Sequence, residues 1–266
     1  MRHIPVLICA ALLAACSGAK PDAPAQETQA APSAPAVPAV PPAQARKVEV
    51  KNELMDFSYA YPAAAAAIPK LKSWLDADLA KQQEDTKQGT LDERKSAKEG
   101  GWEPRTYAHA TQWKVVTEIP GWLSLSADRW EYTGGAHGNP WFETILWDKA
   151  ANVRRDPLSL FTSKSALSAA IRPAFCAQID KQREEKRGEP VTRSADGLFS
   201  DCIDPVESTV ILGSSDRQHF DRIGVLVGPY AAGPYAEGSY EATIPVDAKI
   251  LALVKPEFRA FFAAKR

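Results

Sequence analysis

Residues 113–148 define the class of fold, and they read WKVVTEIPGWLSLSADRWEYTGGAHGNPWFETILWD. β-branched and aromatic side chains are concentrated in three runs, which is typical of strands. Pro120-Gly121 separates the first run from the second, and the glycine-rich loop 133–138 separates the second from the third. Short turns between such runs favour hairpins. The segment therefore predicts an antiparallel β meander.

Helical spacing of apolar residues occurs on both sides of the meander. A helix is expected to begin after Pro69 and to continue through the charged segment 82–101, ending at Gly100-Gly101. A second helix is predicted over 163–186, and a terminal helix over 248–262. The apolar stripes of the first two helices are Leu71, Trp74, Leu75 and Leu79, and Leu167, Ile171, Phe175 and Ile179. Each stripe would pack one face of its helix against the strands.

Further strands are expected around the meander, at 48–61, 206–212, 223–227 and 240–246. No repeated strand-helix-strand unit is present, so a parallel α/β sheet is not indicated. The fold class is therefore α+β, an antiparallel β meander packed with two to three helices.

The composition limits the possible partners. The chain has 266 residues, of which 45% are hydrophobic, with 32 Lys and Arg against 33 Asp and Glu. A formal net charge of −1 gives no general attraction to a polyanion, so nucleic acid is not expected as a partner. No internal apolar run approaches the roughly 20 residues that a membrane-spanning helix needs. A polytopic membrane protein is therefore excluded.

Residues 1–15 have the pattern of a secretory signal peptide, with a basic start, an apolar stretch and small residues before Cys16. Leu13-Ala14-Ala15-Cys16 matches the bacterial lipobox, in which the cysteine is lipidated and becomes the new N-terminus. The resemblance to sorted bacterial lipoproteins implies the outer membrane, because Ser17 and not Asp follows that cysteine. We expect a lipoprotein signal peptide and a protein held at the outer membrane, facing the periplasm, by its lipid alone. The alternative is an ordinary signal peptide with a chance cysteine at its cleavage site.

The segment that follows is rich in proline and alanine. Between Ser17 and Arg46 there are 30 residues, of which 7 are Pro and 10 are Ala. Such a composition buries too little apolar surface to offset the entropy lost on ordering. Proline-rich segments extend by about 3 Å per residue. We expect residues 16–47 to be a disordered tether between the membrane and the folded part.

The cysteines divide by location. Cys9 lies in the expected signal peptide and Cys16 is the expected lipidation site, so Cys176 and Cys202 remain. An even pair in an exported protein points to a disulfide. Neither a CxxC spacing nor a histidine cluster accompanies the pair, so a metal site is not expected.

Two glycine-containing loops carry a resemblance to a known family. Tyr132 begins the sequence YTGGAHG, in which Gly134 and Gly135 allow positive φ and His137 lies where the chain reverses. Segment 228–234 reads GPYAAGP, and the sequence ATIP follows it. Together these motifs resemble the extracytoplasmic domain that RsiV-type anti-sigma factors share with the accessory region of PdaC-type peptidoglycan deacetylases.

The resemblance implies an α+β envelope domain of two linked modules. A PdaC-like module would span 48–120, and an RsiV-like module with the GGAH loop would span 121–266. That domain has no settled molecular function, although the anti-sigma members bind lysozyme through it. Those members have a transmembrane helix and a cytoplasmic sigma-binding segment, which are not expected here. Regulation of a sigma factor is therefore not inferred.

The candidate site residues lie in and beside the two loops. His137 could contact a ligand, with Glu131, Asp128 or Asp148 as its partner, or it could hydrogen-bond backbone carbonyls and fix the hairpin; we favour the structural role. The tyrosines could line a recognition surface or fill the core. The candidates are Tyr132, Gly134, Gly135, His137, Asn139, Tyr230 and Tyr235.

The histidines do not suggest a metal-dependent deacetylase, which needs two closely spaced histidines and an aspartate. His109, His137 and His219 lie 28 and 82 residues apart, without an HxxxH or HxxEH motif. The GxSxG motif of many serine hydrolases is also missing. We therefore expect a non-catalytic, lipid-anchored envelope protein without a cofactor that binds a lysozyme-like protein or peptidoglycan. The alternatives are a cell-wall hydrolase or deacetylase-like enzyme that uses the GGAH loop, and a purely structural lipoprotein.

Overall fold

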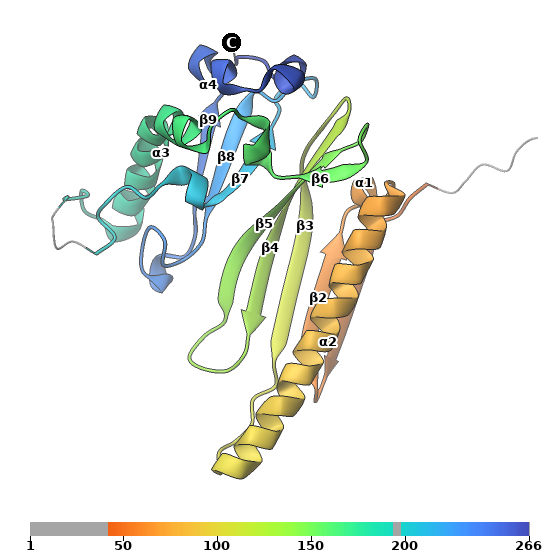
Figure 1. The fold of residues 1–266 in the computed structure, drawn as a ribbon. Coiled ribbons are helices and arrows are strands. Elements are labelled where there is room, and N and C mark those ends of the chain that lie inside the picture. Colours follow the sequence, from red (N-terminus) through yellow and green to blue (C-terminus); the bar gives the residue numbers. More distant parts are fainter. Residues whose placement is uncertain (1–41, 194–197, 266) are drawn as a thin grey trace, which may run out of the picture. The chain divides into compact units, whose positions relative to one another are not determined.

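The computed structural model describes residues 42–193 and 198–265 (Figure 1). The expected signal peptide, Cys16 and most of the expected tether lie outside the described residues. The described part contains a six-stranded sheet, a three-stranded sheet and several helices, which confirms the α+β class. None of its helices is both long and apolar enough to cross a bilayer.

The larger sheet has the strand order β1-β2-β3-β4-β5-β6. All neighbouring strands are antiparallel except β2 and β3. β3 to β5 form the predicted meander, and β6 adds a short strand that the sequence does not predict. Gly121, with φ 85°, lies in the turn between β3 and β4, so the sheet continues across the module boundary expected at residue 120. The strands are β1 (Arg46–Asn52), β2 (Met55–Tyr61), β3 (Ala108–Ile119), β4 (Trp122–Tyr132), β5 (Asn139–Asp148) and β6 (Val153–Arg155).

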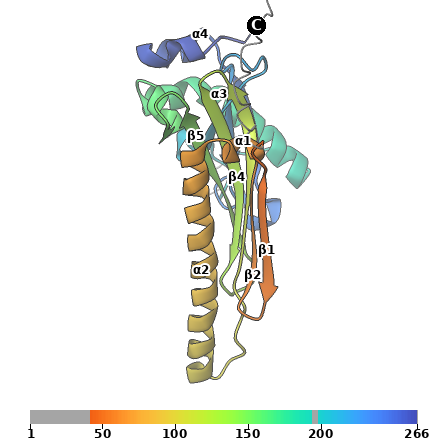
Figure 2. The same cartoon turned by 90° about the vertical axis from the view of Figure 1, so that its right-hand side faces the viewer.

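The sequence does not predict the parallel pairing of β2 with β3, which the helix between them explains. After the short α1 (Ala63–Ala66), α2 (Pro69–Gly100) has 32 residues. At 1.5 Å per residue it is about 48 Å long. It runs back along the sheet (Figure 2) and returns the chain to the end where β2 began. The next strand therefore runs parallel to β2.

The first core lies between α2 and one face of the larger sheet. Leu71, Leu75 and Leu79 of the predicted stripe are buried there, as is Trp113 of β3. The helix ends where the sequence predicts, because Gly101 adopts the left-handed conformation with φ 77°.

The smaller sheet has the order β7-β8-β9 and is antiparallel throughout. α3 (Lys164–Arg187) packs beside β9. The side-chain amide of Gln178 donates to Thr243 O (3.0 Å) and accepts from Thr243 N (2.9 Å), and Gln182 makes the same pair of bonds with Glu241. The helix thereby occupies the outer edge of β9. The strands are β7 (Thr209–Gly213), β8 (Arg222–Val227) and β9 (Tyr240–Pro245), and the short 3₁₀ helices are η1 (Pro157–Leu160), η2 (Pro205–Glu207) and η3 (Tyr235–Glu237).

A second core lies around α3 and the smaller sheet, and Trp122 of β4 reaches into it. The rings of Phe220, Phe258 and Phe261 surround the Trp122 indole at 5.4–6.1 Å. This packing covers the face of the larger sheet opposite α2 near Trp122. Asp128, further along the same face of β4, is exposed.

The terminal segment forms two short helices, so the single helix expected over 248–262 is wrong. α4 (Ala248–Leu253) is followed by η4 (Pro256–Phe261). Lys255, which precedes the proline, has an extended backbone with ψ 143°. Proline lacks an N–H and disfavours the helical conformation in the residue before it. The helix therefore cannot continue through this position.

Candidate functional site

The loop between β4 and β5 turns on two glycines. Gly134 and Gly135 have φ values of 95° and 87°, which residues with a Cβ rarely adopt. A Cβ at either position would meet no atom within 4 Å, so conformation alone favours glycine. At Gly138 there is no room for a side chain, because a Cβ would lie 2.2 Å from the indole of Trp130. No local pattern in the sequence marks Gly138 and Trp130 as neighbours.

His137 joins this loop to the loop between β8 and β9. Its Nδ1 lies 3.0 Å from Gly138 O, and its Nε2 lies 3.2 Å from the Tyr230 hydroxyl. A carbonyl only accepts, so Nδ1 carries the hydrogen and Nε2 accepts from Tyr230. The imidazole also stacks on the Tyr235 ring at 3.7 Å between centroids, and the Tyr235 hydroxyl donates to Gly138 O (2.9 Å). We call His137, Tyr230 and Tyr235 the aromatic cluster.

Tyr230 is held in an unusual conformation at the surface. Its φ is 67° and its side chain is 54% exposed. Bonds from Tyr230 N to Gly233 O (3.0 Å) and from Ala231 N to Gly228 O (3.4 Å) close the turn around it. A non-glycine residue in the left-handed region costs energy, and such residues are frequent at functional sites.

Three of the candidates predicted from the sequence thus meet in the aromatic cluster, and the others lie nearby. The Tyr132 hydroxyl donates to Gly135 O (3.3 Å) inside the β4–β5 loop. Asn139 is exposed at the start of β5, opposite Glu131 of β4. These two side chains do not enter the aromatic cluster.

The three carboxylates that the sequence offers as partners for His137 have other neighbours. Asp128 pairs with Lys114, and Asp148 pairs with Arg155 (2.8 Å). Glu131 lies beside His109 in the β3–β4 register. Within the described ranges, the ring nitrogens of His137 therefore contact a carbonyl and a hydroxyl, and no carboxylate.

A groove with a volume of about 380 Å³ lies on the larger sheet's face away from α2. Small side chains form its floor, Ser58 and Ala60 from β2 and Ala110 from β3. Trp130 lies beside Ala110 in the β3–β4 register and forms one wall. The Trp130 ring is parallel to that of Tyr132, with 6.5 Å between centroids and 12° between planes. Because Trp130 also packs on Gly138, it connects the groove with the aromatic cluster.

The charged groups in and around this groove are paired. Lys47 pairs with Glu49 (2.8 Å) on β1, and Lys114 pairs with Asp128 across β3 and β4. Arg129, which also borders the groove, pairs with Asp78 (2.6 Å) and Glu143 (2.7 Å). Ser58 and Gln112 are neutral polar side chains on the groove's face of the sheet. The groove therefore combines an aromatic wall with polar groups that carry no net charge.

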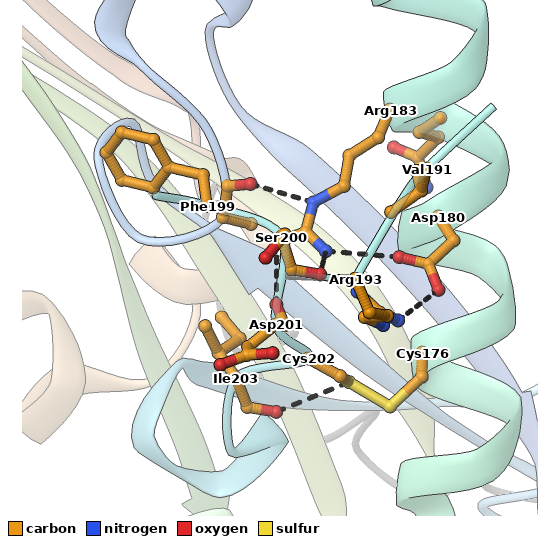
Figure 3. A network of polar contacts seen from close by, with 12 residues as sticks. Cys176, Asp180, Arg183, Val191, Arg193, Phe199, Ser200, Asp201, Cys202 and Ile203 are labelled. Atoms are coloured by element: carbon orange, nitrogen blue, oxygen red, sulfur yellow. Dashed lines mark hydrogen bonds and ion pairs between the residues drawn. A yellow bond between two sulfur atoms is a disulfide. The ribbon is translucent and has the colours of Figure 1, made fainter. Parts of the chain in front are cut away.

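Arg183 of α3 is buried beneath the β8–β9 loop and hydrogen-bonds to its backbone. Its guanidinium is fully buried and donates to Ala232 O (2.8 Å) in the loop and to Asp201 O (2.9 Å), and it pairs with Asp180 (3.1 Å). Figure 3 shows this network beside the Cys176–Cys202 bond. The two cysteines form the disulfide that the sequence predicts, with their Cα atoms 5.6 Å apart.

Arg187 lies one turn further along α3 and forms an ion pair with Glu237 of the same loop. Its Nε and Nη2 lie 2.8 and 3.1 Å from the two carboxylate oxygens. This hydrogen bonding lowers the pKa of Glu237 below its usual value, although burial opposes the effect. Lys186 adds bonds to Glu237 O (2.7 Å) and Ser239 O (2.6 Å). Polar contacts with α3 therefore fix the loop that carries Tyr230 and Tyr235.

Metal-ligating residues are not clustered in the part of the chain that the structure describes. No group of three or more His, Cys, Asp or Glu side chains there could hold a metal ion. The site consists of the aromatic cluster, the groove beside it and the α3 contacts behind it.

Residues 48–140 match the family model of deacetylase PdaC. This segment runs from within β1 to the start of β5 and includes the GGAH loop and all residues that line the groove except Lys47. No curated protein matches the chain. A DUF3298 family protein from Pseudomonas aeruginosa PAO1 is similar in structure, with 16% identity, a TM-score of 0.48, and coverage of 85% of this chain and 99% of that one. A member of the same family from Bacteroides fragilis has 17% identity, a TM-score of 0.42, and coverage of 76% and 90%.

Proposed function

We propose that this chain is a non-catalytic, lipid-anchored envelope protein that binds peptidoglycan through the groove and the aromatic cluster. The observation that carries this proposal is the Trp130 wall beside a floor of small side chains with balanced charge. Sugar rings present apolar C–H faces and hydroxyl edges. A tryptophan face suits the first, and side chains such as Ser58 and Gln112 suit the second.

The contacts of His137 support binding over catalysis. A general base needs a free ring nitrogen within reach of the proton that it removes, and a carboxylate commonly orients its other nitrogen. Both nitrogens of His137 are engaged within the protein, by Gly138 O and the Tyr230 hydroxyl. The alternative, a hydrolase or deacetylase-like enzyme using the GGAH loop, would require this arrangement to open.

A lysozyme-like protein is the second candidate ligand, from the resemblance to RsiV-type anti-sigma factors. Exposed Tyr230 favours it, because tyrosine is enriched in protein interfaces. We place it second because the groove, rather than a flat surface, lies next to the cluster.

The location of the protein is part of the proposal. The lipobox at Cys16 would anchor the chain at the outer membrane, facing the periplasm, and the proline-rich segment would let the folded part reach the cell wall. The disulfide suits an exported protein. Replacing Cys16 by Ala should abolish lipid labelling and release the protein from the membrane fraction. Unchanged membrane association would contradict the anchor.

Cosedimentation of the full chain with purified peptidoglycan tests the ligand, with an immobilised lysozyme column as the second arm. Wild-type protein should sediment with peptidoglycan, and Tyr230→Ala should sediment less. Trp102→Ala is a matched control, because Trp102 is 53% exposed at the far end of α2. Retention on lysozyme alone would favour the second candidate. Release of soluble sugar or acetate from the peptidoglycan would favour the enzyme.

A further inference from the structure

Two segments are attached to the same side of α3. Cys176, Asp180, Arg183 and Arg187 are spaced at i, i+4, i+7 and i+11, which places them along one stripe of the helix. One attached segment is 199–203, which contains Cys202. The other is the β8–β9 loop, which carries Tyr230 and Tyr235.

Segment 199–203 is attached covalently and by hydrogen bonds (Figure 3). The disulfide fixes Cys202 to α3. Arg183 donates to Ser200 O (3.3 Å) and Asp201 O (2.9 Å), and Arg187 donates to Phe199 O (3.4 Å).

The same two arginines hold the β8–β9 loop, through Ala232 O and the Glu237 carboxylate. A guanidinium is planar, and its N–H groups have fixed directions. Arg183 can therefore reach Ala232 O, Ser200 O and Asp201 O together only while both segments keep their places. Ala232 lies between Tyr230 and Tyr235 in the chain, so its position bears directly on the aromatic cluster.

We propose that the Cys176–Cys202 disulfide, acting through Arg183 and Arg187, positions the β8–β9 loop and makes the binding site sensitive to redox state. A dithiol reductant would supply two electrons and two protons to the S–S bond, yielding two cysteine thiols while the reductant forms its own disulfide. Segment 199–203 would then be held by hydrogen bonds alone. The arginines would lose the fixed carbonyls that orient them, and the loop would shift. The effect on ligand binding rests on the proposed function, but the effect on the loop does not.

The histidine resonances of the full chain, labelled with ¹³C at histidine, test the loop directly. The ring of His137 stacks on Tyr235 at 3.7 Å, so the tyrosine ring current should displace its resonance. Dithiothreitol should move the His137 resonance and leave that of His109, which lies in β3 of the larger sheet, in place. Cys176→Ser with Cys202→Ser should give the same spectrum without reductant. An unchanged His137 resonance in reduced, folded protein would overturn the proposal.

If the reduced protein unfolds, every histidine resonance moves and reduction no longer tests the loop. The Arg187→Gln variant then tests the position of the loop instead. This variant keeps the disulfide and removes the ion pair between residue 187 and Glu237, so the His137 resonance should move. Lys181→Gln is the control, because Lys181 is an exposed residue of α3 that pairs with Glu185 and contacts neither attached segment. Equal spectra for the two variants would overturn the proposal.

Binding to soluble peptidoglycan fragments gives the functional consequence. The Kd should rise at least about tenfold on reduction, which corresponds to about 1.4 kcal/mol. A Kd that is unchanged although His137 moves would overturn the claim that redox state controls binding. If the oxidised protein binds no fragment, the proposed function fails, while the His137 spectra still decide whether the disulfide positions the loop.

Discussion

Lowering the pH from 7 to 5 should destabilise the larger sheet through His109. This β3 residue is 4% exposed, contacts Thr111 Oγ1 (2.8 Å) and stacks on Phe57 at 5.7 Å. Burial lowers its pKa from 6.5 to about 4, and the positive charge of Arg129 adds to the effect, while Asp78 and Asp85 oppose it.

The size of the effect follows from the two pKa values. Between pH 6.5 and 4, the unfolded chain binds a proton at His109 and the folded chain does not, so stability falls as the pH falls. One pKa unit corresponds to about 1.4 kcal/mol, which gives a loss of about 2 kcal/mol at pH 5 and about 3 kcal/mol below pH 4. Above pH 6.5 the contribution is fully present.

Urea unfolding of wild type and His109→Gln at pH 7 and pH 5 measures this contribution. The variant cannot take up the proton, so it should lose about 2 kcal/mol less than wild type between the two pH values. Comparing the two proteins removes the effect of carboxylates that titrate in both. Equal losses in wild type and variant would refute the reasoning about His109.

Three further changes should have separable effects on stability. Replacing Cys176 and Cys202 by Ser should cost about 3 to 4 kcal/mol in urea unfolding, because the bond joins residues 26 apart; a cost near zero would contradict this. Gly138→Ala should cost about 1 to 3 kcal/mol, because its Cβ would overlap Trp130, and an unchanged melting temperature would show that the loop yields. His137→Ala should cost only about 1 kcal/mol in a thermal melt, because Gly138 O keeps its bond from Tyr235, and a cost well above that would show a larger structural role.

The helices and the meander could be predicted because their signals are local. Leu71, Leu75 and Leu79 are spaced for one helix face, and Pro120-Gly121 fits a tight turn. The parallel pairing of β2 with β3 depends on the direction in which α2 returns the chain, which no local pattern records. The single helix expected over 248–262 is wrong because Pro256 interrupts a segment whose apolar residues have helical spacing.

The candidate site was only partly visible in the sequence. The adjacent glycines indicated the GGAH loop, and the second motif indicated Tyr230. The groove was missed because Ser58, Ala110 and Trp130 come from three strands, and only the register of the sheet brings them together. The contact between Gly138 and the Trp130 indole likewise depends on packing in three dimensions, which no local pattern records.

The most direct test of the proposed function is the affinity of the full chain for soluble peptidoglycan fragments, measured by calorimetry for wild type, Trp130→Ala and Trp102→Ala. Trp130 lines the groove, whereas Trp102 is exposed beyond the end of α2. We predict saturable binding by wild type and Trp102→Ala, and at least about tenfold weaker binding, or about 1.4 kcal/mol, by a folded Trp130→Ala. Absence of binding by wild type, or equal affinity of the two variants, would contradict the proposal.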